Sequence, residues 1–501
     1  MVLPALASEA SRQHPDRAAF TGAGWQLTFR DLDRCSDALA VRLARLGVRA
    51  GDVVALVLPT CVDHPLAYLA TAKLGAVTAA VNARLPVAQR ARLLALAAPR
   101  LLVTAYDDIG GPAEVLRIEP AAEGPSALSL SNVDGEAPPL LAPDPDRPVA
   151  VVFTSGTTGL PRGAVFCERQ LQAVRATDVG TAWGGGGRLL AGTSLAHLGF
   201  MTKFAGQLQS GATSRLLARW SPGVALRLTA ELGLSSLGGV PTQLALVLAE
   251  AERTGTALPA LRGVVVGGGP VTPALVRRAR AVLGVPVTTR YSCTEAALGC
   301  GTSAADPPED AEDTVGRPLP GVTLALRDAD GRDVGVGDVG EVLLRSAAVM
   351  SGYWRDPDAT AAAFTADGFV RTGDLGRLDE RGRLRLVGRA REMYVRGGYN
   401  VFPVAVEAVL SAAPGVRAVA VGAVPDEVLG QVGVAVVVPD DPARPPTLQH
   451  LREHAAVQLA RHELPERLLV TDALPLTPGD KLDRSALQVL AASAPDPGRL
   501  R

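Results

Sequence analysis

The stretch from Phe153 to Ala164 carries the residues in this chain whose types and spacing are best suited to chemistry. It reads Phe-Thr-Ser-Gly-Thr-Thr-Gly-Leu-Pro-Arg-Gly-Ala and overlaps the end of the apolar segment Val149–Phe153. Its glycines let backbone N–H groups converge, and its hydroxyl side chains add further donors, so the loop is suited to wrap a phosphate. Because Leu160, Pro161 and Arg162 follow the Ser/Thr/Gly run, the spacing excludes a Walker-type loop. The alternative interpretation is a plain solvated turn.

Lysine usage singles out a second candidate, Lys481. The chain has 50 basic residues, but its only lysines are Lys73, Lys203 and Lys481. Lys481 lies in the Pro- and Gly-punctuated stretch Leu474–Arg484, where a compact ammonium can reach one oxygen at a crowded reaction centre more readily than a planar guanidinium. A surface lysine without a role is the alternative.

Several segments in a fixed order, from about Leu27 to Leu487, resemble the adenylate-forming superfamily. This superfamily includes acyl-CoA synthetases, the adenylation domains of peptide synthetases, and luciferases. The resemblance implies a catalytic role for Lys481 and for Thr158, and a phosphate-binding role for the rest of the hydroxyl loop: Thr154, Ser155, Gly156, Thr157, Gly159 and Arg162. Arg162 replaces the lysine that is usual in the family; both are cationic, so we expect ATP binding to persist.

The segment Arg290–Glu295 resembles the family's aromatic-Gly-x-Thr-Glu motif. By that resemblance Tyr291 flanks the adenine, Thr294 contacts the α-phosphate and Glu295 is the magnesium ligand, while Ser292 stands at the usual glycine of the nucleotide site. A flat ring suits a purine face, and carboxylate oxygen suits a hard cation that bridges phosphates. Without the resemblance, the tyrosine is read as a core residue and the glutamate as a surface residue.

Two short segments resemble the family's ribose and hinge motifs. In Arg371–Leu375 the resemblance implies that Asp374 accepts hydrogen bonds from both ribose hydroxyls, as an acceptor-only side chain can. In Gly388–Glu392 it implies that Arg389 reaches the ribose or a phosphate and that Arg391 is the pivot. An aspartate after a glycine is otherwise a common turn residue.

The remaining segments resemble the parts of the family that bind the acid and the thiol. The resemblance implies that His197 gates the acyl pocket, with a core histidine as the alternative. It implies that Gly238–Thr242 and Gly267–Pro270, with Gly268, form pocket walls, where glycines leave room for a ligand. The resemblance also implies that Gly397 and Gly398 line a pantetheine tunnel. The apolar residues expected around the acyl group are Leu198, Met201, Phe204, Gly239 and Leu298.

Alternating helical and strand patterns predict an α/β fold. Phe29–Leu46 and Pro273–Leu283 have helical spacing, Val53–Leu58 has a strand pattern, and such alternation is typical of mostly parallel sheets covered by helices. From Gly316, short strands between Asp/Gly turns predict a small antiparallel or β-barrel-like section. A helix is expected over Leu448–Ala460.

We place the domain boundary near residues 389–391. Residues 1–389 then form a large domain that binds ATP and the acyl substrate, and residues 390–501 form a small mobile α+β lid that carries Lys481. A chain of 501 residues has ample material for two cores.

Composition excludes several function classes. The formal charge of −1 gives no indication of a nucleic-acid partner. The apolar runs are too short for a membrane span and the N-terminus lacks a signal pattern, so we expect a cytoplasmic protein. The five cysteines form no CxxC pair, and Cys293 is expected to be inert.

The residues and the resemblance together imply an ATP-dependent acid–thiol ligase, an acyl-CoA synthetase that forms an acyl-AMP and transfers the acyl group to CoA. Its cofactors are ATP, Mg²⁺ and coenzyme A, and its acid is expected to be fatty, aromatic or terpenoid-like. Three alternatives stay open: an adenylating enzyme that loads an acyl carrier protein or stops at the adenylate, a non-catalytic nucleotide-binding homologue, and a luciferase-like oxygenase. The oligomeric state is also open, with a homodimer as one alternative.

Overall fold

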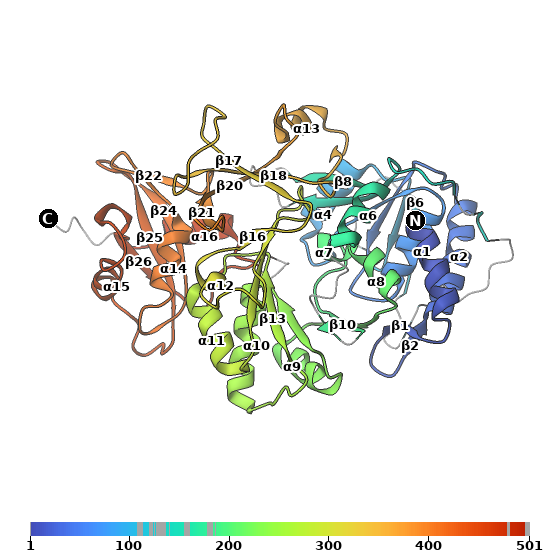
Figure 1. Ribbon diagram of the computed structural model, residues 1–501, viewed down its shortest axis with the longest axis horizontal. Coiled ribbons are helices and arrows are strands. Elements are labelled where there is room, and N and C mark those ends of the chain that lie inside the picture. Colours follow the sequence, from blue (N-terminus) through green and yellow to red (C-terminus); the bar gives the residue numbers. More distant parts are fainter. Residues whose placement is uncertain are drawn as a thin grey trace.

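The computed structural model describes residues 2–107, 114–119, 124, 126, 137–139, 141–154, 161–177, 184–185, 187–477 and 481–495. These residues form five β-sheets and the helices around them. The elements near the N-terminus and those near the C-terminus occupy opposite ends of the long axis, with β12–β16 and their helices between them (Figure 1). The α/β class is therefore confirmed.

The largest sheet has the strand order β19-β8-β7-β4-β3-β5-β6. The strands from β7 to β6 are parallel, whereas β8 and β19 are antiparallel to their neighbours. All five residues of β3 are buried, as expected of a strand covered on both faces. The elements of this region are α2 (Phe29–Arg45), β3 (Val53–Val57), α3 (Asp63–Lys73), β4 (Val77–Ala80), α4 (Val87–Ala97), β5 (Leu101–Thr104), β6 (Glu114–Arg117), β7 (Pro148–Thr154), β8 (Arg162–Cys167) and β19 (Gly352–Tyr353).

Two further sheets complete the part of the chain before residue 320. One has the order β2-β1-β11-β10-β9 and the other β12-β13-β14-β15-β16. The predicted helix over Pro273–Leu283 is confirmed, and Thr272 caps it by accepting a hydrogen bond from Leu275 N–H. The elements are α1 (Leu3–Gln13), β1 (Ala18–Thr21), β2 (Gln26–Thr28), α6 (Glu168–Thr177), β9 (Gly184–Gly185), β10 (Arg188–Ala191), α7 (Leu198–Met201), α8 (Phe204–Ser210), β11 (Thr213–Leu216), α9 (Pro222–Glu231), β12 (Ser236–Gly239), α10 (Pro241–Thr254), β13 (Gly263–Gly267), α11 (Pro273–Leu283), β14 (Val287–Tyr291), β15 (Cys300–Gly301), α12 (Asp310–Asp313) and β16 (Arg317–Pro318).

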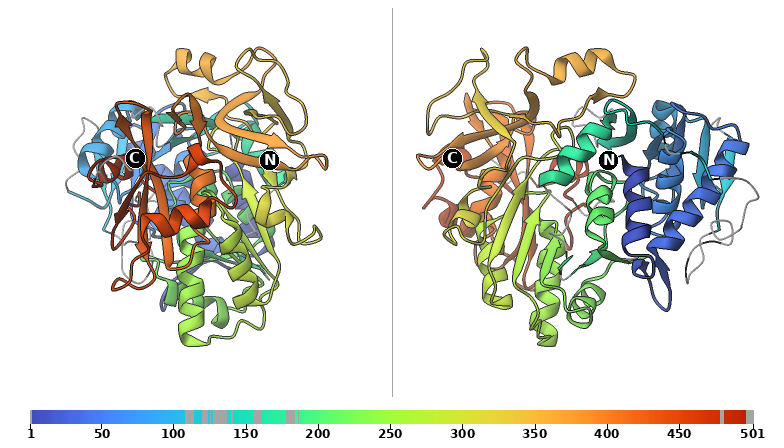
Figure 2. Two further views of the ribbon diagram at one scale, coloured as in Figure 1. Left: turned by 90° about the vertical axis from the view of Figure 1, so that its left-hand side faces the viewer. Right: turned by 45° about the vertical axis from the view of Figure 1, so that its right-hand side comes forward.

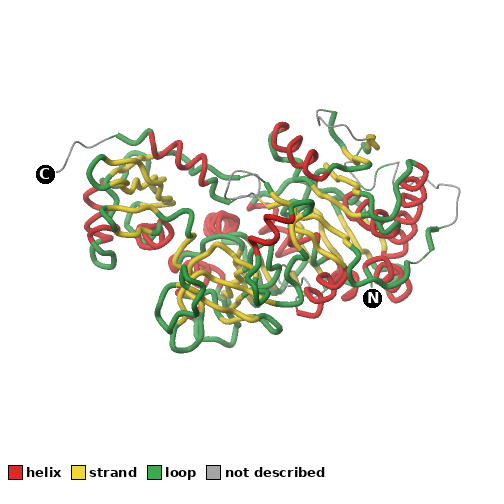
Figure 3. Tube along the Cα trace, turned by 90° about the horizontal axis from the view of Figure 1, so that it is seen from above, coloured by secondary structure: helices red, strands yellow, loops and turns green. Residues whose placement is uncertain are grey.

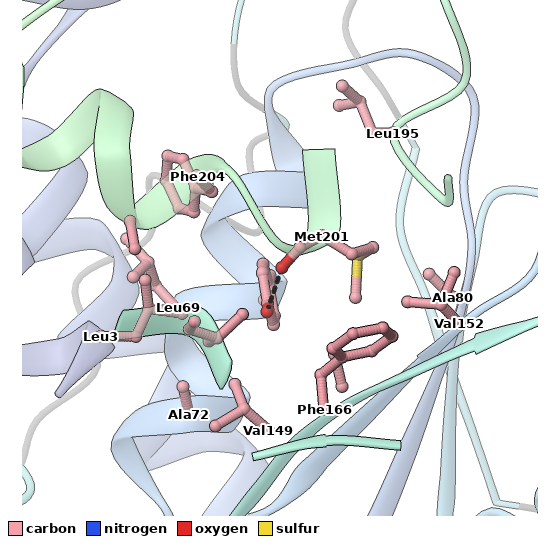
Figure 4. Packing of buried hydrophobic residues seen from close by; sticks show 14 of the residues in the cluster. Leu3, Leu69, Ala72, Ala80, Val149, Val152, Phe166, Leu195, Met201 and Phe204 are labelled. Atoms are coloured by element: carbon pink, nitrogen blue, oxygen red, sulfur yellow. Dashed lines mark hydrogen bonds between the residues drawn. The ribbon is translucent and has the colours of Figure 1, made fainter. Parts of the chain in front are cut away.

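The main hydrophobic core joins the largest sheet to helices α1, α3, α7 and α8. Val152 and Phe166 from the sheet pack with Met201 and Phe204 from the short helices (Figure 4). The hydroxyl of the buried Tyr68 donates a hydrogen bond to the backbone oxygen of Met201 at 2.7 Å, so the one polar atom of this ring is satisfied. Met201 and Phe204, expected to face the acyl group, are 1% and 2% exposed and belong to this core.

The section after residue 320 is an antiparallel sheet. Its order is β17-β18-β20-β21, and every neighbouring pair is antiparallel. Among the described strands, β17 and β21 stand at the two ends of this order and do not pair with each other. The section is therefore the antiparallel sheet that was one of the two expectations, and the other expectation, a barrel-like section, is wrong. The elements are β17 (Thr323–Arg327), β18 (Gly340–Arg345), α13 (Pro357–Ala363), β20 (Val370–Leu378) and β21 (Leu384–Arg389).

The C-terminal unit has its own sheet, with the order β23-β22-β25-β24 and β26 paired to β25. Its orange-to-red elements face the viewer in the left view of Figure 2, and they form a lobe of their own at the end marked C in Figure 3. The helix expected to reach Ala460 ends at Ala455, and Val457 beyond it is 83% exposed rather than buried. The elements are β22 (Tyr394–Arg396), β23 (Tyr399–Val401), α14 (Pro403–Leu410), β24 (Val416–Asp426), β25 (Gly430–Pro439), α15 (Leu448–Ala455), the 3₁₀ helix Arg461–Glu463, β26 (Arg467–Val470) and α16 (Arg484–Ala492).

Candidate active site

The hydroxyl loop, within Phe153–Ala164, connects β7 to β8 at the end of the largest sheet where β7 finishes. β7 runs parallel to β4, so the loop begins at the carboxyl end of the parallel strands, where ligands commonly bind in open α/β sheets. Thr154 and Arg162 are opposite each other in the β7–β8 register, and they mark the two ends of the loop. Five predicted residues of the loop lie outside the described residues: the phosphate-binding Ser155, Gly156, Thr157 and Gly159, and Thr158, which was predicted to be catalytic.

Asp374 lies at the centre of a hydrogen-bonded group that the sequence did not predict as a unit. It faces Arg389 directly across β20 and β21. The Nε of Arg389 donates to its Oδ1 at 2.9 Å, and the hydroxyl of Tyr291 donates to its Oδ2 at 2.7 Å. A carboxylate offers about four acceptor positions, so two remain for a ligand with two hydroxyls. This arrangement brings together three of the predicted nucleotide-site residues.

Burial and the Asp374 carboxylate change the pKa values of both its partners. Burial raises the pKa of Tyr291 well above its usual value, and Asp374 raises it further, so the phenol remains a donor. Burial alone would lower the pKa of Arg389, but the carboxylates of Asp374 and Glu392 outweigh it and raise that pKa. Arg389 therefore stays a cation beside Asp374.

Glu295 lies in the turn that follows β14. Its Oε1 accepts a hydrogen bond from the hydroxyl of Tyr353 at 2.8 Å, and its backbone oxygen accepts one from Met350 N–H at 2.9 Å. Thr294, beside it, is half-buried, while Ser292 is exposed. In the part of the chain that the structure describes, no arginine or lysine forms an ion pair with Glu295.

The donor set fits Mg²⁺ held jointly with a ligand. Within the described ranges there is no cluster of three or more acidic, histidine or cysteine side chains that could hold a metal. A hard cation bound here would take the Glu295 carboxylate and complete its coordination with water and phosphate oxygens, which is how Mg²⁺ commonly binds beside nucleotides.

Lys481 reaches the site from the C-terminal unit and faces Gly268. A Cβ atom built on Gly268 would lie 3.9 Å from Nζ of Lys481, and Gly268 has a positive φ of +77°. Lys481 is exposed at the surface, yet the protein atoms around its ammonium desolvate it in part, and this effect, followed by the cation of Arg389, lowers its pKa from the ordinary 10.5. A pair of cations at one place favours an anionic ligand between them.

Gly397 and Gly398 form the two-residue turn between β22 and β23. Their φ values of +56° and +87° are the left-handed conformations that a type I′ hairpin turn requires. Next to this turn, the ring of Tyr399 stacks on His462 with centroids 4.5 Å apart. Arg391, the predicted pivot, is exposed in the short connection between β21 and β22.

His197 and Cys293 complete the predicted residues. His197 is the N-cap residue of α7, and its backbone oxygen accepts from Phe200 and Met201 N–H at 3.1 Å each. Its role as a gate stays a prediction. Burial, followed by the Glu295 charge, raises the pKa of Cys293 well above its ordinary value, so the thiol is protonated and unsuited to nucleophilic attack.

Sequence reasoning missed the supports behind these residues. Tyr353 supports Glu295, and Arg484 supports the region of Lys481. The guanidinium of Arg484 lies 3.2 Å from Glu392 and donates to both carboxylate oxygens of the buried Glu407. Glu407 is thus a structural ion-pair partner of Arg484. The sequence signals that could have indicated these supporting residues were the strings Gly352-Tyr353-Trp354 and Lys481-Leu-Asp-Arg484.

The family models match most of the chain. The model described as AMP-binding enzyme matches residues 7–354, and the one described as AMP-binding enzyme C-terminal domain matches residues 405–481. Among the helices of the described ranges, none has both the length and the hydrophobicity required to cross a membrane.

Relatives and solved structures match over nearly the full length. The chain is 32% identical to the fatty acid–[acyl-carrier-protein] ligase ScoC of Streptomyces coeruleorubidus, covering 95% of this chain and 94% of that protein. It is 31% identical to the sulfoacetate–CoA ligase of Cupriavidus necator, covering 97% of each. The solved structure of the amide bond synthetase McbA from Marinactinospora thermotolerans is similar with a TM-score of 0.86 and 30% identity, covering 97% of this chain and 99% of that one.

Proposed function

The chain belongs to the AMP-binding enzyme family of adenylate-forming enzymes, and from that premise we propose that it is an ATP-dependent acid–thiol ligase that makes an acyl-CoA. One observation carries the proposal: Lys481, from the C-terminal unit, meets Gly268 beside the group formed by Tyr291, Asp374 and Arg389. Residues from segments far apart in the chain thus surround one place. An enzyme that activates an acid on a nucleotide needs such convergence, because two anions must be brought together.

The proposed first half-reaction forms a mixed anhydride. A carboxylate oxygen of the acid attacks the α-phosphorus of ATP, the bond from this phosphorus to the bridging oxygen breaks, and pyrophosphate leaves with the electron pair. Asp374 orients the ribose, and the ammonium of Lys481 stabilises the charge that develops between the reacting oxygens. Mg²⁺, held by Glu295, would supply further neutralisation of phosphate charge. No side-chain nucleophile is required.

The proposed second half-reaction transfers the acyl group. The thiol sulfur of CoA attacks the acyl carbonyl carbon, its proton passes to solvent, and the bond to the AMP oxygen breaks. We propose that residues 390–501 rotate as a unit about Arg391, which withdraws Lys481 and brings Gly397 and Gly398 to the site. A hinge of this kind needs few exposed connecting residues, and the connection between β21 and β22 is short and exposed at Arg391.

The substrate is proposed to be a largely apolar acid. Leu198 and Phe200 are partly buried apolar side chains beside His197 and pack against the main core. Apolar walls of this kind favour a fatty, aromatic or terpenoid-like acid over an amino acid.

A second candidate function is transfer to a carrier protein. Its support is the 32% identity to ScoC, which is a carrier-protein ligase. The two candidates share the first half-reaction and differ only in the thiol that accepts the acyl group.

One experiment separates them. A panel of carboxylic acids is incubated with MgATP and with CoA, a phosphopantetheinylated carrier protein or no thiol, and pyrophosphate, AMP and thioester are measured. We expect pyrophosphate release with apolar acids and thioester formation with CoA. Thioester formation on the carrier protein alone would support the second candidate. The absence of pyrophosphate exchange with every acid would contradict both.

A further inference from the structure

Tyr353 lies next to the strand that leaves the hydroxyl loop. β19, of which it is part, pairs antiparallel with β8, and Tyr353 is opposite Ala164 in the register. Trp354 N–H donates to the backbone oxygen of Gly163 at 2.7 Å, and Tyr353 N–H donates to Thr360 Oγ1 at 2.8 Å. The backbone of Tyr353 is thus fixed on both sides relative to Arg162, the last cation of the loop.

The side chain of Tyr353 contacts two groups of opposite charge. Its hydroxyl donates to Glu295 Oε1 at 2.8 Å, and the guanidinium carbon of Arg162 lies 5.2 Å from the centre of its ring. That distance is within the range of a cation–π contact.

Arg162 and Glu295 both contact the Tyr353 side chain, and among the described residues no ion pair joins the two. The guanidinium rests on the ring face, while the carboxylate is held at the ring's hydroxyl end. A free arginine beside a glutamate would form a bidentate ion pair. Such a pair would leave neither the cation for a phosphate nor the carboxylate for a metal.

We infer that Tyr353 is a positioning residue that hydrogen-bonds the carboxylate of Glu295 and holds Arg162 on its ring, so that both charges are presented separately to one bound nucleotide. The inference rests on the proposed function, because that function supplies the nucleotide. It assigns different tasks to two parts of one side chain: the hydroxyl serves metal-dependent binding, and the ring serves metal-independent binding. It also explains an arginine at position 162, since a planar guanidinium stacks on a ring better than an ammonium.

Four variants separate the tasks in a binding experiment. Binding of ATP to Tyr353→Phe, Tyr353→Leu, Glu295→Gln and the double variant Tyr353→Phe/Glu295→Gln is measured by calorimetry, with Mg²⁺ titrated from zero and again in EDTA. Tyr106→Phe is the matched control, because Arg90 lies over the Tyr106 ring at 5.4 Å, outside the proposed site. Unfolding temperature is recorded for each protein.

We expect Tyr353→Phe to raise the Mg²⁺ concentration for half-maximal binding about tenfold, the cost of one hydrogen bond to a charged group. Its affinity for ATP in EDTA should stay within about twofold of wild type, because the ring remains. Tyr353→Leu should weaken binding in EDTA about fivefold as well. Tyr353→Phe combined with Glu295→Gln should be no weaker than Glu295→Gln alone, since the hydroxyl acts through that carboxylate.

Three results would overturn the inference: an unchanged Mg²⁺ requirement in Tyr353→Phe, multiplying effects in the double variant, or equal losses with and without Mg²⁺. Tyr353→Phe decides the question even where Tyr353→Leu fails to fold. A wild-type protein that binds MgATP but releases no pyrophosphate with any acid would contradict the proposed function and leave this test intact.

Discussion

The proposed ribose side of the site, at Asp374, is held differently from its proposed lysine side, at Lys481. Asp374 is 6% exposed, and its two partners come from the same strand pair and from an adjacent sheet of the large N-terminal part. Lys481 comes from the C-terminal unit and meets Gly268 only where the two parts touch. The first side is assembled once the N-terminal part folds, whereas the second depends on the orientation of the C-terminal unit.

This difference fits a two-step reaction. The nucleotide must stay bound through both steps, so a fixed ribose site is useful throughout. In the proposed reaction the lysine acts only while charge develops at the phosphate, so its movement away from the site would not slow the second step. Variants on the two sides should therefore differ in which half-reaction they impair.

Replacing Lys481 should have the largest effect. Lys481→Ala should lower the rate of pyrophosphate release about 10²–10³-fold, the usual cost of a lost charge stabiliser in a reaction centre. Acyl transfer to CoA from a supplied acyl-adenylate should be unchanged, because the lysine side serves only the first step. Single-turnover kinetics of both half-reactions measure this, with the exposed Arg444→Ala of the same unit as the control. Equal losses in both half-reactions would contradict the assignment.

Replacing Asp374 should affect both half-reactions. Asp374→Ala removes the ribose acceptor and leaves Arg389 beside an empty position, so we expect the KM for ATP to rise about 10²-fold. Binding of AMP, measured by calorimetry, should weaken by the same factor, which Lys481→Ala should not do. Asp338→Ala changes an exposed aspartate in a turn next to the same sheet and is the matched control. Intact AMP binding in Asp374→Ala would show that the ribose lies elsewhere.

The residues of the ribose side were predictable one by one but not as a group. Asp374 and Arg389 were each recognisable from a short motif, yet their pairing depends on the register of β20 and β21, which the turn between them sets. Tyr291 joins Asp374 across 83 positions, and Tyr353 joins Glu295 across 58. Contacts over such separations follow from how sheets pack, and local periodicity carries no information on them.

The boundaries of helices and strands also depend on contacts that the local sequence pattern does not reveal. The strand predicted over Val53–Leu58 is present as β3, Val53–Val57, and it was predictable because a parallel strand buried on both faces is a continuous apolar run. The helix after Leu448 was predicted too long, because the pattern that extends to Ala460 includes Val457, which packing leaves exposed. Whether an apolar residue is covered depends on its neighbours in space.

Removing the hydroxyl of Tyr291 should have a smaller effect than removing Asp374. Tyr291→Phe keeps the ring for the adenine and deletes one hydrogen bond to the carboxylate, so we expect the KM for ATP to rise about fivefold with kcat unchanged. The comparison of KM with kcat is the measurement, because a loss of packing would change the unfolding temperature instead. A loss as large as that of Asp374→Ala would mean that the hydroxyl contacts the nucleotide directly.

The smallest expected effect is a pH dependence confined to the lysine side. Desolvation and the Arg389 cation lower the pKa of Lys481 below 10.5, and only the ammonium stabilises developing negative charge. The kcat/KM for ATP in pyrophosphate release should therefore fall as pH rises through that lowered pKa, since this parameter reports the free enzyme. Acyl transfer from a supplied adenylate should lack this alkaline limb, and so should the residual activity of Lys481→Arg.

Stability should change in the opposite direction over the same pH range. Between the folded-state pKa of Lys481 and 10.5, the unfolded chain binds more protons at this lysine than the folded chain does, so the lysine's contribution to the free energy of unfolding rises with pH. The buried Tyr291 and the partly buried Cys293, whose pKa values are raised, oppose this trend in the whole protein. The difference in unfolding free energy between wild type and Lys481→Met isolates the lysine. If kcat/KM and this difference in unfolding free energy both fell as pH rises, alkaline unfolding rather than titration of Lys481 would explain the loss of activity at high pH.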